Sequence, residues 1–217
     1  MVGVKTLSSF TVWSWNLLGA SFALNAYVAH CGSSAAANND NDSCVVDPRV
    51  LSLAVWMFEV SGPVVLLIGA VVKYALWPQA LAHGRSDLLK TWRALTMHNA
   101  NVVMVLVEIA LLGGLPVRWR DFPVTCFYGL VYVLFAWSTR LGVWAPKKDG
   151  PQFIYFFFDT TLGWTATYAL AALLFGLATF YGLFAAVHEV LEHLGGGVTT
   201  HAAAAVLVAA MVCRFRD

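Results

Sequence analysis

Apolar residues run along the chain in long stretches that short polar segments separate. A helix needs about 20 mostly apolar residues to cross the hydrocarbon core of a bilayer. The stretches that reach this length cover residues 9–30, 50–77, 94–114, 122–144 and 160–187. A further run, 199–213, is shorter and rich in alanine. It is expected to cross the bilayer as a tilted helix, to cross a locally thinned bilayer, or to lie in the membrane interface. The pattern predicts an all-α, polytopic transmembrane helical bundle of five to six spans, which forms a single domain over residues 1–217.

Basic residues are distributed unequally between the two sides of such a bundle. With six spans, one side receives only Arg49, Arg118 and Arg120. The remaining basic residues fall on the opposite side: Lys5, Lys73, Arg85, Lys90, Arg93, Arg140, Lys147, Lys148, Arg214 and Arg216. Because cytosolic loops collect Lys and Arg, this second side is predicted to be cytosolic. The prediction is therefore an integral membrane protein with a cytosolic N-terminus.

The stretch HCGSSAAANNDNDSCVVDPR, residues 30–49, connects the first two runs on the luminal side. Cys31 and Cys44 bracket most of it and could form a disulfide, and Asn41 opens an Asn-Asp-Ser glycosylation sequon. Both features need an oxidising compartment, which agrees with the charge count and predicts the endoplasmic reticulum or the plasma membrane. The alternative is a flexible loop with two chance cysteines, because one pair and one sequon are weak signals.

Composition strengthens the membrane interpretation and excludes one class of partner. Hydrophobic residues make up 59% of the chain and charged residues 12%, where an ordinary soluble domain has about 25% charged residues. The formal net charge is +1, and the sequence has no basic tract. Nucleic acid is therefore not expected as a partner.

The third run, LTMHNANVVMVLVEIALLGG, carries several polar residues inside a predicted span. Each such group costs free energy in hydrocarbon unless it finds a partner, so these side chains are expected to face the bundle interior. At about 100° per residue, His98, Asn101 and Glu108 fall on one helix face. Asn99 lies roughly a quarter turn away. The run is thus predicted to present a polar stripe to the neighbouring spans.

The predicted topology sorts the intramembrane polar residues into two layers. Thr11, His98 and Asp159 lie within about two turns of the cytosolic surface, given a rise of about 1.5 Å per residue. The luminal layer contains Asn25, Glu59 and Glu108. A hydroxyl, an imidazole and a carboxylate at one depth provide a nucleophile, a base and an orienting group. The same groups are equally typical of hydrogen bonds that hold helices together, and the luminal layer is predicted to be structural.

Three stretches together resemble the androgen-induced-protein and rolling-stone superfamily of membrane proteins. They are MHNANVVMVLVEIALLGGLPVRWRDFPVTCFYGLVYVLFAW (97–137), FIYFFFDTT (153–161) and FTVWSW (10–15). The resemblance is firmest over 97–161, looser over the first two spans and absent from the Ala-rich tail. It implies a multi-span membrane protein with both termini in the cytosol. In the androgen-induced branch it also implies a threonine hydrolase that cleaves fatty acid esters of hydroxy fatty acids within the membrane.

The resemblance places the catalytic His of that branch on His98, in MHNAN, and its nucleophilic Thr on Thr11, in FTVWSW. His98 would act as the base for the Thr11 hydroxyl. Asp159 or Asn101 would orient the imidazole, and an oxyanion donor would come from Asn99, Asn101 or Trp15. The substrate would be a membrane lipid, and the reaction would need no metal or other cofactor.

Two functions outside hydrolysis remain open from the sequence. The Asn-Ala-Asn that follows His98 is closer to the rolling-stone branch, which predicts a non-enzymatic protein of fusion, adhesion or scaffolding that acts through its luminal loop. Bis-histidine haem binding would pair His98 with His30, His188 or His193. Depth disfavours that pairing, because His98 lies at the cytosolic end of its span and the other three lie at luminal ends.

Overall fold

The structure is a computed structural model of the chain and describes residues 9–37, 46–111, 117–143, 155, 158–193, 195 and 197–217. Over these residues the chain is helical and forms no strand. The α-helices are α2 (Phe10–Ala37), α3 (Pro48–Val71), α4 (Trp77–Ala82), α5 (Asp87–Lys90), α6 (Trp92–Leu95), α7 (Asn101–Leu111), α8 (Phe122–Val143), α9 (Trp164–His193) and α10 (Val198–Val212). Two π-helical turns, η1 (Val72–Leu76) and η2 (Thr96–Ala100), and two 3-10 turns, η3 (Trp119–Asp121) and η5 (Thr160–Leu162), join them.

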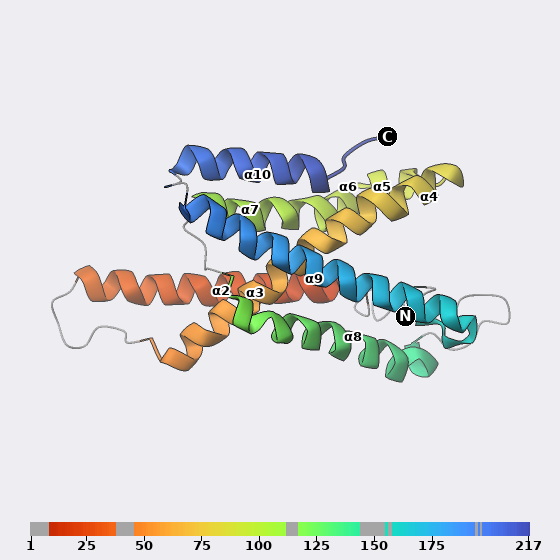
Figure 1. The fold of residues 1–217 in the computed structure, drawn as a ribbon, viewed down its shortest axis with the longest axis horizontal. Coiled ribbons are helices and arrows are strands. Elements are labelled where there is room, and N and C mark those ends of the chain that lie inside the picture. The colour runs from red at the N-terminus through yellow and green to blue at the C-terminus, as the bar shows by residue number, and fades with distance from the viewer. Residues whose placement is uncertain are drawn as a thin grey trace.

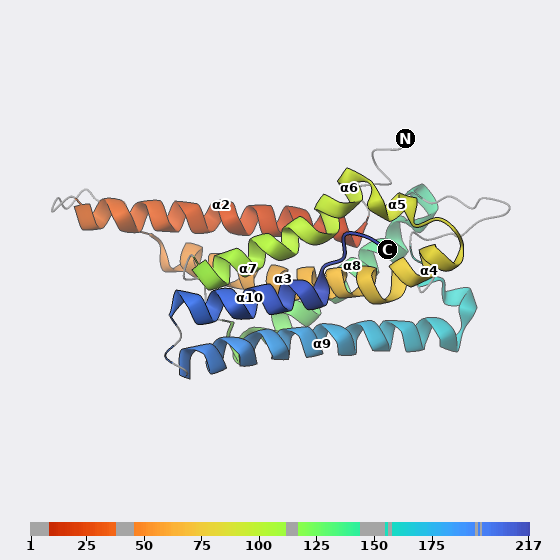
Figure 2. The same ribbon diagram turned by 90° about the horizontal axis from the view of Figure 1, so that it is seen from above.

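The long helices run alternately in opposite directions along the bundle (Figure 1). Helices α2, α7 and α9 run one way, and α3, α8 and α10 return. As a result, the start of α2 and the end of α10 lie at the same end, together with η1 (Figure 2). We call this the Lys73 end of the bundle, and the opposite end, where α8 begins, the Arg118 end.

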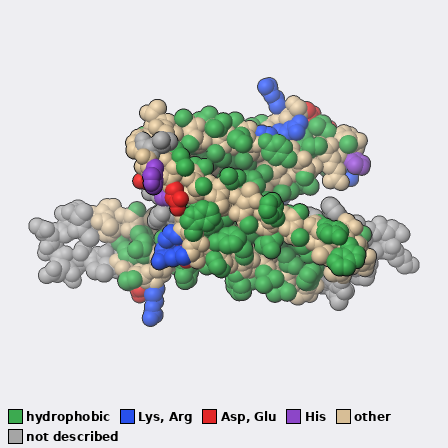
Figure 3. Space-filling model, in the orientation of Figure 1, with side chains coloured by type: hydrophobic (Ala, Val, Ile, Leu, Met, Phe, Trp, Pro, Cys, Tyr) green, Lys and Arg blue, Asp and Glu red, His purple; other side chains and the backbone are tan. Residues whose placement is uncertain are grey.

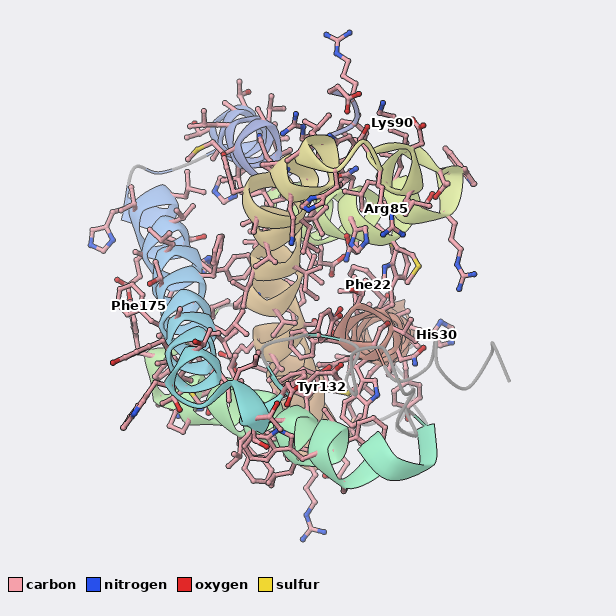
Figure 4. All side chains as sticks on the ribbon, turned by 90° about the vertical axis from the view of Figure 1, so that its right-hand side faces the viewer. Phe22, His30, Arg85, Lys90, Tyr132 and Phe175 are labelled. Carbon is pink, nitrogen blue, oxygen red and sulfur yellow. The ribbon has the colours of Figure 1, made fainter. Side chains whose placement is uncertain are left out.

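Helix α3 is the central element of the bundle. Viewed along the long axis, it lies in the middle, with α9 on one side and α2 on the other (Figure 4). In its most apolar 18-residue window 78% of the residues are buried, against 17% and 22% in the corresponding windows of α8 and α9. The core around α3 joins Phe58 and Val65 to Leu18 of α2 and Tyr181 of α9.

Among the described residues, three helical segments are long and apolar enough to cross a membrane: Pro48–Ala82, Trp119–Thr139 and Trp164–His193. Helix α10 is apolar but shorter. The outward faces of α8, α9 and α10 are covered by apolar side chains, such as Phe127, Phe175 and Leu207, which are 64%, 74% and 62% exposed (Figure 3). An all-helical molecule with such faces and such helices confirms the predicted helical fold and the presence of candidate transmembrane helices.

The fifth predicted span, 160–187, begins and ends later in the structure. The carboxylate of Asp159 accepts a hydrogen bond from the Thr161 N–H at 3.0 Å and caps the turn η5, and Gly163 follows with φ of +56°. That left-handed conformation favours glycine and separates η5 from α9, so the helix starts at Trp164. It then continues to His193 before Gly195 turns the chain into α10.

Residues 213–217, which follow α10, are fastened to the Lys73 end. The indole N–H of Trp77 donates to Asp217 Oδ1 at 3.0 Å, and the Arg214 guanidinium lies 5.1 Å from the Trp77 ring centre. Lys90 forms an ion pair with Asp217. Hydrogen bonding to Lys90 holds the pKa of Asp217 below its usual range, and the same bond raises the pKa of Lys90. The end of the chain is thereby bound to α4 and α5.

Candidate functional site

The candidate site lies where α2 packs against the π-helical turn η2. The indole N–H of Trp15 donates to the backbone carbonyl of Met97 at 2.8 Å. A π-helical turn has one residue more than an α-helical turn, and such turns occur frequently at functional sites. The bond therefore fixes α2 directly beside the turn that carries His98.

His98 occupies the middle of η2 and is partly buried. Its Nδ1 atom is fully buried and has no hydrogen-bond partner. A buried polar nitrogen without a partner costs about 1–3 kcal/mol, so its presence needs an explanation. An imidazole that accepts a proton only when a substrate is bound is one such explanation.

Thr11 lies on the inward face of α2, one turn before Trp15. This face also contains Ser14, Leu18 and Ser21, which are completely buried. The Thr11 side chain is hydrogen-bonded to Tyr155, a residue that sequence reasoning did not single out. Burial raises the pKa of the Tyr155 hydroxyl and keeps it protonated at neutral pH. Thr11 thus has a phenol beside it.

Among the described residues no hydrogen bond joins Thr11 to His98. The two residues instead flank the contact of Trp15 with Met97, Thr11 from α2 and His98 from η2. Catalytic hydrogen bonds are often long or poorly aligned before substrate binds, so the lack of a direct bond does not exclude Thr11 and His98 as a nucleophile and its base.

The two asparagines beside His98 are both buried, although the predicted face contained only Asn101. Asn99 clamps the backbone of Arg214: its Nδ2 donates to the carbonyl at 2.8 Å, and its Oδ1 accepts from the N–H at 3.1 Å. Asn101 Oδ1 accepts from the Val102 N–H, whereas its buried Nδ2 has no partner. The π-helical turn explains the difference, because it breaks the 100° periodicity on which the predicted face was based.

The predicted supporting carboxylate, Asp159, is bound within its own turn. Its Oδ1 accepts from the N–H of Thr161 at 3.0 Å and from the Thr161 hydroxyl at 2.6 Å. These bonds give Asp159 a capping role at η5. Its neighbour Phe158 accepts an indole hydrogen bond from Trp137 at 3.1 Å through its backbone carbonyl.

Aromatic rings enclose the Thr11 side of the site. Phe10 and Tyr132 have ring centres 4.7 Å apart, and Trp13 lies 4.7 Å from Phe135. Tyr132 is 2% exposed and points into the interior from α8 (Figure 4). A cavity of about 360 Å³ adjoins this cluster, with the following lining: Trp137, Phe158, Thr160, Gly163, Trp164, Ala166, Thr167 and Leu170. The nucleophile candidate thus lies behind an apolar wall that borders a cavity.

Glu59, which was predicted to belong to a luminal polar layer, takes part in a buried ion-pair network. Glu59, whose side chain is 1% exposed, accepts from the Arg118 N–H at 2.5 Å and lies 3.3 Å from Nε of the same residue. Arg118 also forms an ion pair with Asp121, in which Nη2 lies 2.6 Å from Oδ2. The geometry of this contact is not that of a hydrogen bond. Trp56 donates to Asp121 at 3.2 Å, and the Tyr181 hydroxyl donates to the Arg118 carbonyl at 2.6 Å. The network joins α3, η3 and α9.

Sequence analysis singled out Glu59 but missed its partner Arg118, and it missed Asp121 and Tyr181, which bind Arg118 in turn. A signal was present, because a buried carboxylate needs a cation, and in the predicted six-span topology Arg118 is one of three basic residues on the side of Glu59. The other members of the layer are less connected in the structure. Asn25 has a buried Nδ2 without a partner, and Glu108 is partly buried on α7.

The cysteines and the loop between α2 and α3 are described in part. Cys31 is disulfide-bonded, while Cys126 and Cys213 are free thiols. Cys44 and Asn41, the predicted disulfide partner and glycosylation site, lie outside the described residues. In the part of the chain that the structure describes, no group of three or more His, Cys, Asp or Glu side chains could hold a metal ion.

Comparison with known proteins places the chain in no family. No protein-family model matches it, and neither a curated protein nor a solved structure does. The resemblance to the androgen-induced and rolling-stone proteins therefore stays a prediction, and the function must be argued from the site itself.

Proposed function

We propose that this protein is an intramembrane lipid-ester hydrolase of five to six spans, with Thr11 as nucleophile and His98 as general base. The observation that carries the proposal is the buried, unpartnered Nδ1 of His98 in a π-helical turn, held beside the helix of Thr11 by the Trp15–Met97 bond. Its substrates would be long-chain esters such as fatty acid esters of hydroxy fatty acids.

The reaction would proceed in two balanced steps. Thr11 Oγ1 attacks the ester carbonyl carbon while His98 takes the hydroxyl proton, and the alkoxide then leaves with that proton as an alcohol. Water, activated by the same imidazole, then cleaves the acyl-threonine to release the carboxylic acid. The Tyr155 hydroxyl beside Thr11 and the free Nδ2 of Asn101 are the candidate donors to the developing oxyanion.

The surroundings of Thr11 support a lipid substrate. The cavity of about 360 Å³ between α8 and the start of α9 borders the aromatic wall, and it carries the hydroxyls of Thr160 and Thr167 among apolar side chains. Because most of this lining is apolar, we place the acyl chain of the substrate in the cavity and its ester group on the Thr11 side of the aromatic wall. We place the Lys73 end in the cytosol, because it collects most of the basic residues, and we place the protein in the endoplasmic reticulum or plasma membrane.

Hydrolysis of long-chain esters by the purified protein tests the proposal. We expect Thr11→Ala and His98→Ala each to lower turnover at least about 100-fold, the usual effect of removing a nucleophile or a general base. Thr179→Ala and His83→Ala are matched controls at exposed positions, and both should retain full turnover. Wild-type turnover in a folded Thr11→Ala or His98→Ala protein would contradict the assignment.

A non-enzymatic role in fusion, adhesion or scaffolding is the second candidate, and the disulfide-bonded state of Cys31 favours it. A disulfide at Cys31, near the end of α2, would fix a binding surface at the Arg118 end. Under this alternative, Cys31→Ser destroys function in a cell-fusion or adhesion assay, whereas His98→Ala leaves it intact. The hydrolase proposal predicts the opposite, that His98→Ala abolishes function and Cys31→Ser leaves it intact.

A further inference from the structure

A second cavity lies between α9 and α10, over α7 and Leu66 of α3. It has a volume of about 290 Å³. Its walls are apolar side chains, among them Leu106 of α7, Phe180 and Leu183 of α9, and Leu207 of α10. Helix α3 separates α9 from α2, so the cavity lies on the far side of α3 from Thr11 (Figure 4). It is therefore distinct from the proposed catalytic site.

The sequence of α10 explains why the space between the helices is empty. The helix contains four consecutive alanines, Ala202–Ala205, and Ala204 and Ala205 face the cavity. Methyl groups cannot fill the distance to α9, where the facing residues are apolar apart from His188 near one end. An apolar cavity of this size stays dry and takes up apolar molecules.

We propose that this groove binds one acyl chain of a bilayer phospholipid. Helix α9, which forms one wall, is a candidate membrane span, so the groove faces hydrocarbon wherever the protein is embedded. A volume of 290 Å³ accommodates roughly ten methylene groups, if each takes about the 30 Å³ of a liquid water molecule. A helix from a second protein is excluded by size, because ten residues at a diameter of about 10 Å occupy on the order of 1,000 Å³.

The two ends of the groove differ, and this difference orients the lipid. His188 of α9 and His201 of α10 line the Arg118 end, where a ring N–H of each would donate to the ester and phosphate oxygens of a bound lipid. At the other end Val212 closes the groove by packing against Gly69 of α3: a Cβ added to Gly69 would lie 2.6 Å from Val212 Cγ1. The headgroup therefore lies at the histidine end, and the acyl chain runs toward α3.

Photocross-linking tests the proposal directly. The full-length protein is reconstituted in phosphatidylcholine nanodiscs that contain a phosphatidylcholine with a diazirine in one acyl chain, and adducts are mapped by mass spectrometry. We expect adducts to concentrate on groove residues such as Leu183, Leu207 and Met211. Phe175, which is exposed and points away from the bundle, reports background labelling by bulk lipid (Figure 4).

A matched pair of variants separates groove binding from general lipid contact. Ala204→Phe fills the groove and should lower adduct yield on Met211 at least tenfold, whereas Ala203→Phe, one residue earlier on the exposed side of α10, should leave it unchanged. If Ala204→Phe does not fold, Ala204→Leu fills part of the groove and should lower the yield by a smaller factor. Equal yields in the Ala204 and Ala203 variants, or labelling of Phe175 as strong as that of Met211, would overturn the proposal. Ester hydrolysis by the Ala204 variant should remain at wild-type level, so the outcome is independent of the catalytic assignment.

Discussion

Replacement of Arg118 by methionine should destabilise the protein strongly, because it leaves the carboxylate of Glu59 buried without its cation. The guanidinium lies 3.3 Å from Glu59 Oε1 and 2.6 Å from Asp121 Oδ2, and the Glu59 side chain is 1% exposed. Removal of one partner from a buried ion pair costs about 3–5 kcal/mol. The backbone N–H of Arg118 still donates to Glu59 in the variant, and the guanidinium is itself 28% exposed, so we expect about 3 kcal/mol.

A double-mutant cycle isolates the interaction. Glu59→Leu removes the charge that Arg118→Met leaves unpaired, so the double variant should be at least about 1.5 kcal/mol more stable than the sum of the two single effects predicts. Free energies of unfolding are measured in mixed micelles with increasing dodecyl sulfate, followed by far-ultraviolet circular dichroism.

The neighbouring arginine is the control for this cycle. Arg120 also approaches Asp121, at 3.6 Å, but its side chain is 73% exposed. Arg120→Met should therefore change the free energy of unfolding by less than about 1 kcal/mol. Additive effects of Glu59→Leu and Arg118→Met, or equal effects of the two arginine variants, would refute the reasoning.

Two further predictions concern the Lys73 end. Gly69→Ala places a Cβ 2.6 Å from Val212 Cγ1 and should cost about 1–3 kcal/mol, and a second change, Val212→Ala, should restore most of the thermal unfolding midpoint. The Lys90–Asp217 ion pair should hold residues 213–217 at neutral pH, as measured by the mobility of a spin label at Phe215. Because the pKa of Asp217 is lowered in the folded protein, its contribution is present above the ordinary carboxyl value of 3.8 and disappears as pH falls through the lower folded value. Because the pKa of Lys90 is raised, its contribution is lost only as pH rises beyond 10.5.

If the double variant Gly69→Ala, Val212→Ala is as unstable as Gly69→Ala alone, the contact between position 69 and Val212 is not the cause of the destabilisation. Lys90→Ala should release the label at all pH values between these limits, and a label that stays immobile in this variant would show that the Trp77 contacts alone hold the segment.

Hydrophobic patterning located the long helices, but among the described residues only three helical segments are long and apolar enough to cross a membrane, and the third predicted run is divided among α6, η2 and α7. The predicted run 199–213 differs from α10, Val198–Val212, by one residue at each end. The boundary of α9 was misplaced even though its signals were present in the sequence: Asp159 caps a short turn, and Gly163 interrupts the helix that the apolar run suggested. Hydropathy alone does not distinguish a capped 3-10 turn from the first turn of a span.

The site was predictable in its residue types but not in its contacts. The inward position of Asn101 on α7 followed from helical periodicity, whereas Asn99 lies in the π-helical turn Thr96–Ala100, which no local sequence signal announced. Beyond it, the partners of the polar residues come from distant segments: Asn99 binds the backbone of Arg214, and Thr11 binds Tyr155. Such pairings depend on how the helices pack, which a single sequence does not specify.

The most direct test of the central claim is to locate the covalent adduct of a fluorophosphonate activity probe. Reaction of the purified, membrane-reconstituted protein with the probe should modify Thr11. Mass spectrometry should then detect the mass of the probe adduct on the peptide that contains FTVWSW. The same peptide should remain unmodified in His98→Ala, which lacks the base, and should be modified normally in His83→Ala. An adduct on another residue, or equal modification of Thr11 with and without His98, would contradict the account.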